Sequence, residues 1–503
     1  MKRPFTKTAF CAAVAVAVAA ALAPLATRSA GAQPAGPTIL HPRLGLDTVV
    51  SGLVTPTSIA FLGTDDLLVL EKNTGKVVRV TDGAVSATVL DLAVNFGSER
   101  GLLGIALHPG FPETDLVYLY WTESTTGADT DVLSETPFLG NRVDRFTWDG
   151  SGLTFDRNLI RIRAIQQDGA AEPRGQGDEG QIERGNHDAG VIAFGPDGKL
   201  YVMIGDVGRR GQLQNLPSGP TLTGLGPTVP DDQFGGPEPD DGHFTGVIVR
   251  LNDNGTVPAD NPFFQVGANM GGEVGANVQK TFAYGIRNSF GMAFDPVSGN
   301  LWAQENGEDA FDELNLVEPG MNSGWIQVAG PLDRIGDYRG IETTSLHHDD
   351  FPNLQQFRWG PERIAETPAE ARSRLFVLPG SRYSDPEFSW KHVLAPAGIG
   401  FVDGGGLGPQ FAGDLFVGFS VPEPLGGPLF HFNLTGNRRK IAVDDPRLRD
   451  RVADNDTFHD MTESESLLIG TDFGVVTDIE TGPGGNLFVV SISNGAIYEI
   501  FRR

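Results

Sequence analysis

Cysteine is almost absent from this sequence, because its 503 residues contain only one, Cys11. A disulfide framework and a thiolate metal site both need several cysteines, so neither is expected. A chain of this length can instead draw its stability from a buried apolar core. Long apolar runs are equally scarce: after the first 32 residues, no stretch is apolar for long enough to span a bilayer.

Basic residues are also few, with 38 Lys and Arg against 64 Asp and Glu. Four of them fall within the first 32 positions, and the remaining 34 leave a net charge of −30. That charge argues against nucleic acids and anionic membranes as partners. It would suit a cationic protein partner, although a solvating acidic surface is the commoner explanation.

The amino-terminal segment has a composition of its own. Basic residues precede an apolar run from Ala9 to Leu25, and Ala30-Gly31-Ala32 offers small residues for cleavage. This order predicts a secretory signal peptide at residues 1–32 and therefore a secreted or periplasmic protein. A membrane anchor is the alternative, but the run is short for one and Pro24 interrupts it.

One pattern recurs through the rest of the chain: an apolar strand, a turn with Gly, Pro or Asp, and a second apolar strand. It occurs at Ser58–Leu70, Leu102–Trp121, Gly190–Ile204, Gly291–Gln304, Gly398–Gly418 and Thr477–Ser491. A third strand follows each copy, and no long helical periodicity is found. Six such units predict an all-β fold, a six-bladed β-propeller formed by residues 33–503. Arg43–Leu53 is expected to supply an outer strand that closes the ring onto the last blade. A pair of β-sandwiches is the less favoured alternative.

Three long insertions are expected as loops, at residues 151–186, 209–244 and 331–389. The last contains His347-His348-Asp349-Asp350, which resembles a metal-binding run. Adjacent residues on an extended segment point in opposite directions, however, so a solvated acidic loop is the better interpretation.

The segment Gly185–Gly208 combines hairpin chemistry with a His and an Asp. Gly195-Pro196-Asp197-Gly198 predicts a turn between two strands, with His187 before the first and Asp206 after the second. Because a hairpin brings its outer ends side by side, the two should lie close together. An imidazole beside a carboxylate is typical of a general base with its orienting partner. The plainer alternative is that both residues cap loops.

Several motifs together resemble the glucose/sorbosone dehydrogenase family of six-bladed propellers, over essentially the whole chain after residue 32. They are Glu99–Phe111, Gly185–Gly208, Gly246–Phe263, Tyr284–Phe294, Asp312–Trp325 and Pro386–Phe401. The resemblance implies an oxidoreductase that oxidises the C1 hydroxyl of an aldose sugar. It also implies pyrroloquinoline quinone (PQQ) and Ca²⁺ as cofactors, with the quinone doing the redox chemistry.

The same resemblance assigns roles to individual residues. His187 would take the sugar hydroxyl proton, with Asp206 as its partner, while Arg287 would stabilise charge on the reduced cofactor. The remaining expected site residues are Asn288, Glu99 and Trp390 beside the cofactor, and Gly307 and Glu308 as calcium ligands through their carbonyls.

The sequence departs from this family at the positions that hold the cofactor's carboxylates. The chain has no Lys between Lys391 and Lys440, and neither Lys nor Arg between Arg451 and Arg502. Glu99 stands where a neutral amide is expected. A propeller of this fold that binds carbohydrate or a protein without redox turnover therefore stays open as an alternative. A cofactor-free hydrolase or lyase using His187 and Asp206 ranks last, because no activated nucleophile is evident.

Overall fold

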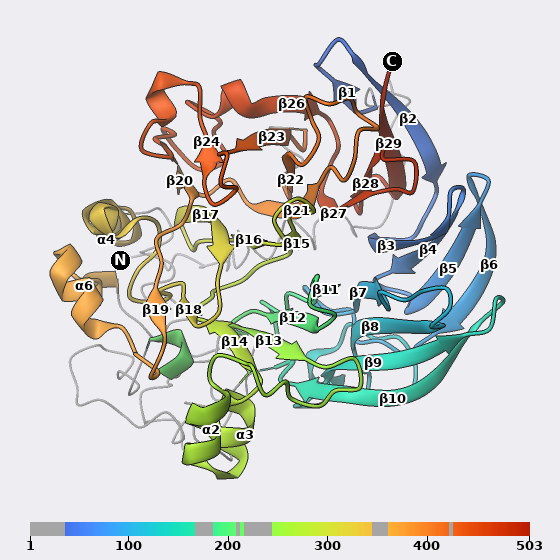
Figure 1. The fold of residues 1–503 in the computed structure, drawn as a ribbon, viewed down its shortest axis with the longest axis horizontal. Coiled ribbons are helices and arrows are strands. Elements are labelled where there is room, and N and C mark those ends of the chain that lie inside the picture. The colour runs from blue at the N-terminus through green and yellow to red at the C-terminus, as the bar shows by residue number, and fades with distance from the viewer. Residues whose placement is uncertain (1–35, 166–184, 208–211, 216–243, 345–360, 422–425) are drawn as a thin grey trace, which may run out of the picture.

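The computed structural model describes residues 36–165, 185–207, 212–215, 244–344, 361–421 and 426–503. Strands dominate these ranges and form six sheets, numbered here in chain order of their innermost strands. Figure 1 shows the sheets standing around a common centre. The predicted signal peptide and the run from His347 to Asp350 lie outside the described residues.

The strands are assigned to the sheets as follows. The first sheet contains β3 (Pro56–Gly63), β4 (Asp66–Glu71), β5 (Lys76–Thr81) and β6 (Ala84–Asp91). The second contains β7 (Leu102–Leu107), β8 (Leu116–Thr122), β9 (Asn141–Trp148) and β10 (Leu153–Ile162). The third contains β11 (Ile192–Phe194), β12 (Leu200–Ile204), β13 (Val247–Leu251), β14 (Thr281–Tyr284), β18 (Met321–Asn322) and β19 (Arg382–Tyr383).

The other three sheets complete the strand list. The fourth contains β15 (Met292–Phe294), β16 (Leu301–Glu305), β17 (Ala310–Val317), β20 (Phe388–His392) and β25 (Val452–Ala453). The fifth contains β21 (Pro396–Phe401), β22 (Leu415–Phe419), β23 (Leu429–Leu434), β24 (Ile441–Ala442), β26 (Leu468–Thr471) and β1 (Thr38–Ile39). The sixth contains β27 (Val476–Thr481), β28 (Leu487–Ser491), β29 (Ala496–Arg502) and β2 (Leu44–Ser51).

The innermost strands close into a ring. Contacts run from β3 to β7, β11, β15, β21 and β27 in turn, and β27 contacts β3 again. Strand β2, from near the start of the described chain, pairs with β29, from Leu44 opposite Arg502 to Ser51 opposite Ala496. The predicted all-β propeller is therefore confirmed, and so is the outer strand expected within Arg43–Leu53.

Helices are short in the described ranges. The α-helices are α2 (Phe264–Met270), α3 (Gly272–Val278), α4 (Ile335–Thr344) and α6 (Pro368–Arg374). Single 3₁₀ turns lie at Leu133–Glu135, Gln212–Gln214, Leu332–Arg334, Pro361–Arg363, Pro446–Leu448 and Glu465–Leu467. None of these helices has the length and apolar character needed to cross a bilayer.

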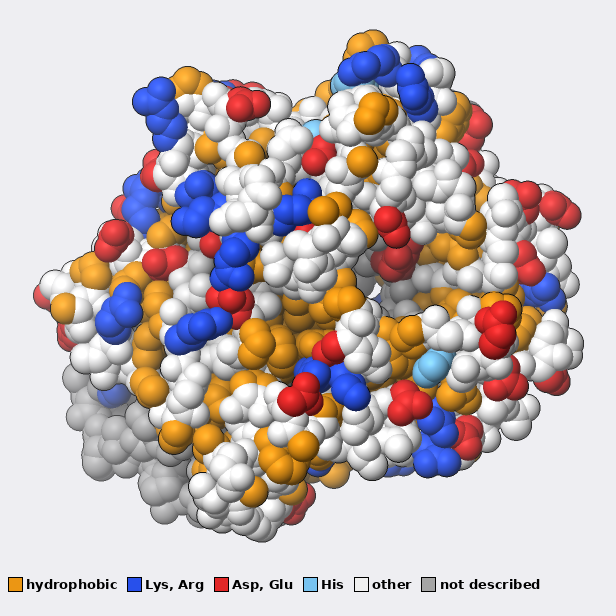
Figure 2. Space-filling view, in the orientation of Figure 1, with side chains coloured by type: hydrophobic (Ala, Val, Ile, Leu, Met, Phe, Trp, Pro, Cys, Tyr) orange, Lys and Arg blue, Asp and Glu red, His pale blue; other side chains and the backbone are white. Residues whose placement is uncertain are grey.

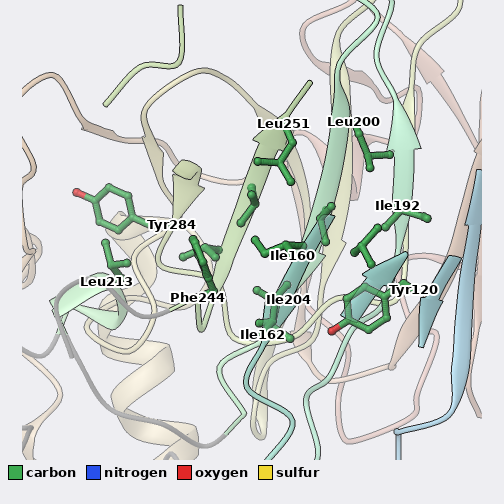
Figure 3. Close-up of a cluster of buried hydrophobic side chains, with 14 of the residues drawn as sticks. Tyr120, Ile160, Ile162, Ile192, Leu200, Ile204, Leu213, Phe244, Leu251 and Tyr284 are labelled. Carbon is green, nitrogen blue, oxygen red and sulfur yellow. The ribbon is translucent and has the colours of Figure 1, made fainter. Parts of the chain in front are cut away.

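The core lies between neighbouring sheets. In Figure 3, Tyr120 and Ile160 of the second sheet pack against Ile192 and Leu200 of the third. Every residue of β12 and β13 is buried, which explains why β12 is a continuous apolar run and β13 is apolar apart from Arg250. Burying each such aliphatic side chain contributes about 1.5–3 kcal/mol, and these contacts hold the ends of the inner strands in place.

The expected loop at 151–186 was wrong over its first part, because β10 occupies Leu153–Ile162 and pairs with β9. This strand is the outermost of its sheet, and most of its residues are exposed. Its polar residues therefore face solvent, and two register shifts interrupt its pairing. Such a strand carries little of the apolar pattern that marks the inner ones.

The expected loop at 331–389 was also wrong in part, because α4, α6, β19 and the start of β20 lie within it. Helix α4 buries Ile335, Tyr338 and Glu342 on one face. The acidic residue on that face hid the helical pattern from the sequence. Of the loop expected at 209–244, only residues 212–215 and 244 are described.

Candidate active site

The β11–β12 hairpin brings His187 and Asp206 together, as the sequence predicted. Ile192 pairs with Val202, so the residues flanking the hairpin meet at one end of the sheet. His187 Nδ1 lies 2.7 Å from Asp206 Oδ1. The indole Nε1 of Trp325 donates to the other oxygen, Oδ2, over 2.9 Å. Because a carboxylate accepts the Nδ1 proton, the lone pair of His187 is left on Nε2.

The dyad is buried on one side and open on the other. The side chain of Asp206 is fully buried, whereas that of His187 keeps 10% of its surface exposed. The geometry suits a base that takes a proton on Nε2 and shares the resulting charge with Asp206.

The backbone around His187 is strained. His187 and Ala189 have φ of 63° and 50°, in the left-handed region. Such conformations cost on the order of 1–3 kcal/mol each and persist only where the surroundings hold them. The Glu99 carboxylate supplies part of that hold by accepting the His187 N–H over 2.6 Å.

Glu99 also joins segments from three sheets. It precedes β7, while His187 precedes β11 and Asn288 precedes β15. Its Oε2 accepts from both the His187 N–H and Asn288 Nδ2, the latter over 3.1 Å. These three predicted site residues lie close together because each one comes just before an innermost strand of the ring.

Arg287 is held from several directions. Its Nε donates to Glu308 Oε2 over 3.1 Å, Nη2 donates to the same oxygen, and Nη1 donates to the Asn306 carbonyl over 3.0 Å. Its guanidinium carbon lies 5.5 Å from the centre of the Trp325 ring. Burial lowers the pKa of Arg287, but the carboxylates of Glu308 and Asp206 more than offset this and raise it above its usual value. The guanidinium therefore stays charged.

The turn after β16 contains the expected calcium ligands. A Cβ at Gly307 would lie 2.2 Å from the Ala310 carbonyl oxygen, so only glycine fits there. Among the described residues, the carbonyl oxygens of Gly307 and Glu308 accept no hydrogen bond. Also within those ranges, no three His, Asp or Glu side chains group as a metal site. These two carbonyls remain as oxygen ligands that a hard cation could use.

Trp390, expected beside a cofactor, is not brought together with this group in the structure. It lies fully buried on β20 and packs edge to face against Phe388 and Phe419. Because β20 pairs with the outer side of β17, its side chains lie in the core between the fourth and fifth sheets. The tryptophan that does reach the site is Trp325. It ends the motif Asp312–Trp325, and that position was the only signal for it.

Three positions near the start of the inner strands of the fifth and sixth sheets have uncharged side chains. Ser420 Oγ donates to the Ala395 carbonyl over 3.1 Å, and Thr477 Oγ1 donates to the Pro56 carbonyl over 3.2 Å. Val475 is buried. These three side chains themselves offer no cation to a ligand.

Two buried cations near Glu99 are already occupied. Lys72 Nζ donates to the carbonyls of Phe96 and Ser98, both over 2.9 Å, and burial and Arg100 lower its pKa to about 7. Arg100 Nε donates to Asn95 Oδ1 over 2.8 Å. These groups order the segment that carries Glu99 rather than point to an external anion. Figure 2 shows the viewed face hollowed near its centre, with acidic side chains close to the opening.

Several known proteins are similar to this chain in sequence. An uncharacterized Synechocystis protein is 31% identical over 379 residues, or 71% of this chain and 74% of its own length. The quinoprotein glucose dehydrogenase B of Acinetobacter calcoaceticus is 28% identical over 57% of this chain and 53% of its own. Human Hedgehog-interacting protein is 24% identical over 50% of this chain and 31% of its own.

Solved structures share the fold. The PQQ-bound aldose sugar dehydrogenase of Streptomyces coelicolor superposes with a TM-score of 0.54 at 22% identity, over 93% of this chain and 98% of its own. The family model described as glucose/sorbosone dehydrogenase matches residues 53–350. That match spans more than half of the sequence and includes every residue of the His187–Arg287–Glu308 group. This chain belongs to the glucose/sorbosone dehydrogenase family.

Proposed function

We propose that this protein oxidises the C1 hydroxyl of an aldose sugar, with PQQ and Ca²⁺ as cofactors. The observation that carries the proposal is the His187–Asp206 pair, in which Nδ1 is bound to Asp206 and Nε2 has no hydrogen-bond partner among the described residues, in a site that also holds Arg287. The family relationship supports a sugar oxidoreductase as the general class. The sugar, the reacting carbon and the cofactors are the specific parts of the proposal.

The chain's own part in the reaction is proton transfer. His187 Nε2 accepts the hydroxyl proton of the sugar as the C1 hydrogen leaves. Asp206 stabilises the imidazolium through its 2.7 Å contact with Nδ1, and Trp325 holds the other carboxylate oxygen. With both oxygens engaged, Asp206 keeps the ring oriented throughout the transfer.

The described residues fit the reactive edge of a quinone. PQQ, when bound, supplies the acceptor for the hydride. A guanidinium has five N–H groups, and three of those on Arg287 donate to Glu308 and Asn306, so the other two are the groups we expect to reach a ligand. The Gly307 and Glu308 carbonyls remain as oxygen ligands for calcium. Arg287 would stabilise negative charge, and Asn288 would keep Glu99 in place.

The carboxylate end of that cofactor is matched less well. Ser420, Val475 and Thr477 offer it no charge, and ionised carboxylates are costly to bury without partners. We therefore expect PQQ to bind more weakly than in family members with cations at these positions. The comparisons give no support to the cationic protein partner that the net charge suggested.

A non-redox binding protein is the second candidate. The match to Hedgehog-interacting protein joins this chain to relatives whose names carry no enzymatic activity. The pairing of Arg287 with Glu308 favours this candidate too, because it neutralises the cation best placed for a cofactor. Such a protein would bind carbohydrate at the same face without turnover.

Reconstitution separates the two candidates. The full chain would be mixed with PQQ and Ca²⁺, and the absorbance of the bound cofactor followed while aldoses are added. A sugar-dependent spectral change that needs both PQQ and Ca²⁺ supports the dehydrogenase. Sugar binding by calorimetry without any spectral change would support the binding protein instead.

We infer two further properties from the sequence and the sheet arrangement. Each of the six sheets forms one blade, which makes the ring a six-bladed propeller. The signal-peptide pattern of residues 1–32 supports export to the periplasm or the medium. Mass spectrometry of the protein recovered from its producing cells would test the second, since a mature chain beginning at residue 33 is expected.

A further inference from the structure

Helix α4 belongs to an insertion, yet it packs directly behind the candidate active site. Its buried residues Ile335 and Tyr338 share one apolar cluster with Phe311 and Trp325. Trp325 is the residue that donates to Asp206 and lies beside the Arg287 guanidinium. Figure 1 shows α4 on the outer side of the ring, next to the fourth sheet. The insertion is therefore in contact with the residues that hold the dyad and Arg287.

A single carboxylate on this helix reaches the turn after β16. Glu342 is 2% exposed, and its Oε1 accepts the backbone N–H groups of Asp309 and Ala310 over 3.0 and 2.9 Å. Both N–H groups lie immediately after Glu308. By accepting from two successive backbone N–H groups, Glu342 fixes the end of this turn.

The position of Glu342 is unfavourable by local rules. It lies in the last turn of α4, where the helix dipole disfavours a negative charge. It is also almost completely buried, which a carboxylate tolerates only when hydrogen bonds compensate. The unfavourable position of this carboxylate is explained if its role is to hold the two backbone N–H groups in one place.

The turn that Glu342 holds is the one that positions Arg287. Asn306, at its start, accepts from Arg287 Nη1, and Glu308 accepts from Nε and Nη2. The carbonyls proposed as calcium ligands lie between these contacts. Movement of the turn would therefore displace the guanidinium and the carbonyls together.

We propose that Glu342 is a positioning residue, which fixes the turn from Asn306 to Ala310 and thereby the guanidinium of Arg287. The proposal rests on the proposed function in assigning a catalytic consequence to that geometry. Glu342 touches neither substrate nor cofactor in this scheme. It acts through the turn.

Three variants of the full chain separate positioning from general stability. Glu342→Ala removes the acceptor, and Glu342→Gln keeps an oxygen that can accept both N–H groups. Ile335→Ala is the matched control, because it removes packing from the same helix and leaves the two hydrogen bonds in place. The alanine variants are expected to lower the melting temperature by similar amounts.

Hydrogen exchange provides a readout that does not depend on activity. In Glu342→Ala, peptides covering residues 284–290 and 305–311 should exchange at least tenfold faster than in Ile335→Ala, and Glu342→Gln should restore protection. If both alanine variants protect these peptides equally, the positioning role is overturned. If Glu342→Ala does not fold, the Glu342→Gln variant decides the question. Its side chain still provides an acceptor, so faster exchange of the same peptides in the folded Gln variant would also overturn the proposal.

Kinetics with the reconstituted enzyme extends the test. Glu342→Ala should lower kcat at least tenfold with little change in KM for the sugar, whereas Ile335→Ala should change neither. Equal kcat values for the two alanine variants would contradict the catalytic consequence. Absence of turnover in the unaltered chain would overturn the proposed function, while the exchange result would still decide whether Glu342 holds the turn.

Discussion

The two halves of the ring differ sharply where their inner strands begin. On the side of the third and fourth sheets, His187, Asp206 and Arg287 are buried and each is bound by a specific partner. On the side of the fifth and sixth sheets, the corresponding positions are Ser420, Val475 and Thr477, with hydroxyl and apolar side chains only. A ligand across the ring would therefore meet acid–base chemistry at one end and a neutral surface at the other. In this fold, the residues suited to proton transfer and the positions suited to binding a cofactor's carboxylates therefore lie on different sheets.

Replacing His187 should have the largest effect, because it removes the proposed base from the half of the ring that carries the acid–base pair. Replacing it with glutamine, His187→Gln, removes the ring nitrogen that accepts the proton and keeps a polar side chain of similar reach. Turnover of the reconstituted enzyme should fall by about 10²–10⁴-fold, the usual loss for a general base. Steady-state kinetics measures this, with melting temperature and sugar binding as controls that should stay nearly unchanged. Near-normal turnover would remove His187 from the mechanism.

The neutral half can be tested by adding charge to it. The triple variant Ser420→Lys, Val475→Arg, Thr477→Arg should bind PQQ more than tenfold tighter, since each charge-assisted hydrogen bond contributes about 1.5–3 kcal/mol. Fluorescence quenching measures the affinity. The matched control places Gln at the same three positions, which adds length without charge.

Equal affinity of the triple variant and the unaltered chain would mean that other cations hold the cofactor. Some loss of stability is expected in the triple variant, because Val475 is buried and Thr477 gives up its bond to the Pro56 carbonyl. Melting curves of the Gln control separate that loss from any effect of charge.

Calcium should stabilise the folded protein through one half of the ring only, because its expected ligands lie in the turn after β16 of the fourth sheet. At 100 times its dissociation constant, an ion that binds only the folded state stabilises it by about 2.7 kcal/mol. The melting temperature should rise by a few degrees with Ca²⁺ relative to EDTA. Mg²⁺ is the control and should have a smaller effect, because it gives up its water ligands reluctantly. Superimposable curves would remove the calcium site from the proposal.

The smallest expected effect concerns the buried carboxyl group of Asp188, which follows His187 in the chain. Burial raises the pKa of Asp188 to about 7, against 3.8 as its ordinary value, while Asn141 binds one of its oxygens over 2.8 Å. The folded state thus keeps this proton up to a higher pH than the unfolded chain. Its contribution to stability is complete below about pH 4 and is lost as pH rises through 7.

The variant Asp188→Asn should therefore lose less stability than the unaltered chain between pH 4 and 7, by at most a few kcal/mol. Urea unfolding of both proteins at pH 5 and at pH 7 measures the difference. Parallel pH dependence in the two proteins would show that Asp188 is ionised throughout this range.

The parts of the structure that local sequence specifies were predicted well. All six strand–turn–strand units are hairpins of the ring, and the His187–Asp206 contact follows from one hairpin. The missed features depend on contacts distant in sequence. Trp325 donates to Asp206 from 119 positions away, and Glu342 accepts from Ala310 across 32.

The differences from the expectations have related physical causes. Trp390 was assigned to the site from its motif, but the motif does not reveal which strand of a sheet faces the centre. Strand β10 was missed because an exposed outer strand needs few apolar residues. Helix α4 was missed because one of its buried positions is an acid.

The pairing of β2 with β29 has a consequence for how the protein is made. Leu44 emerges from the ribosome early, and its partner Arg502 emerges almost 460 residues later in this chain. Until then β2 has an unpaired edge, which is the kind of surface that promotes aggregation. The ring therefore closes only after β29 has been synthesised, and β2 is the edge that an assisting chaperone would protect until then.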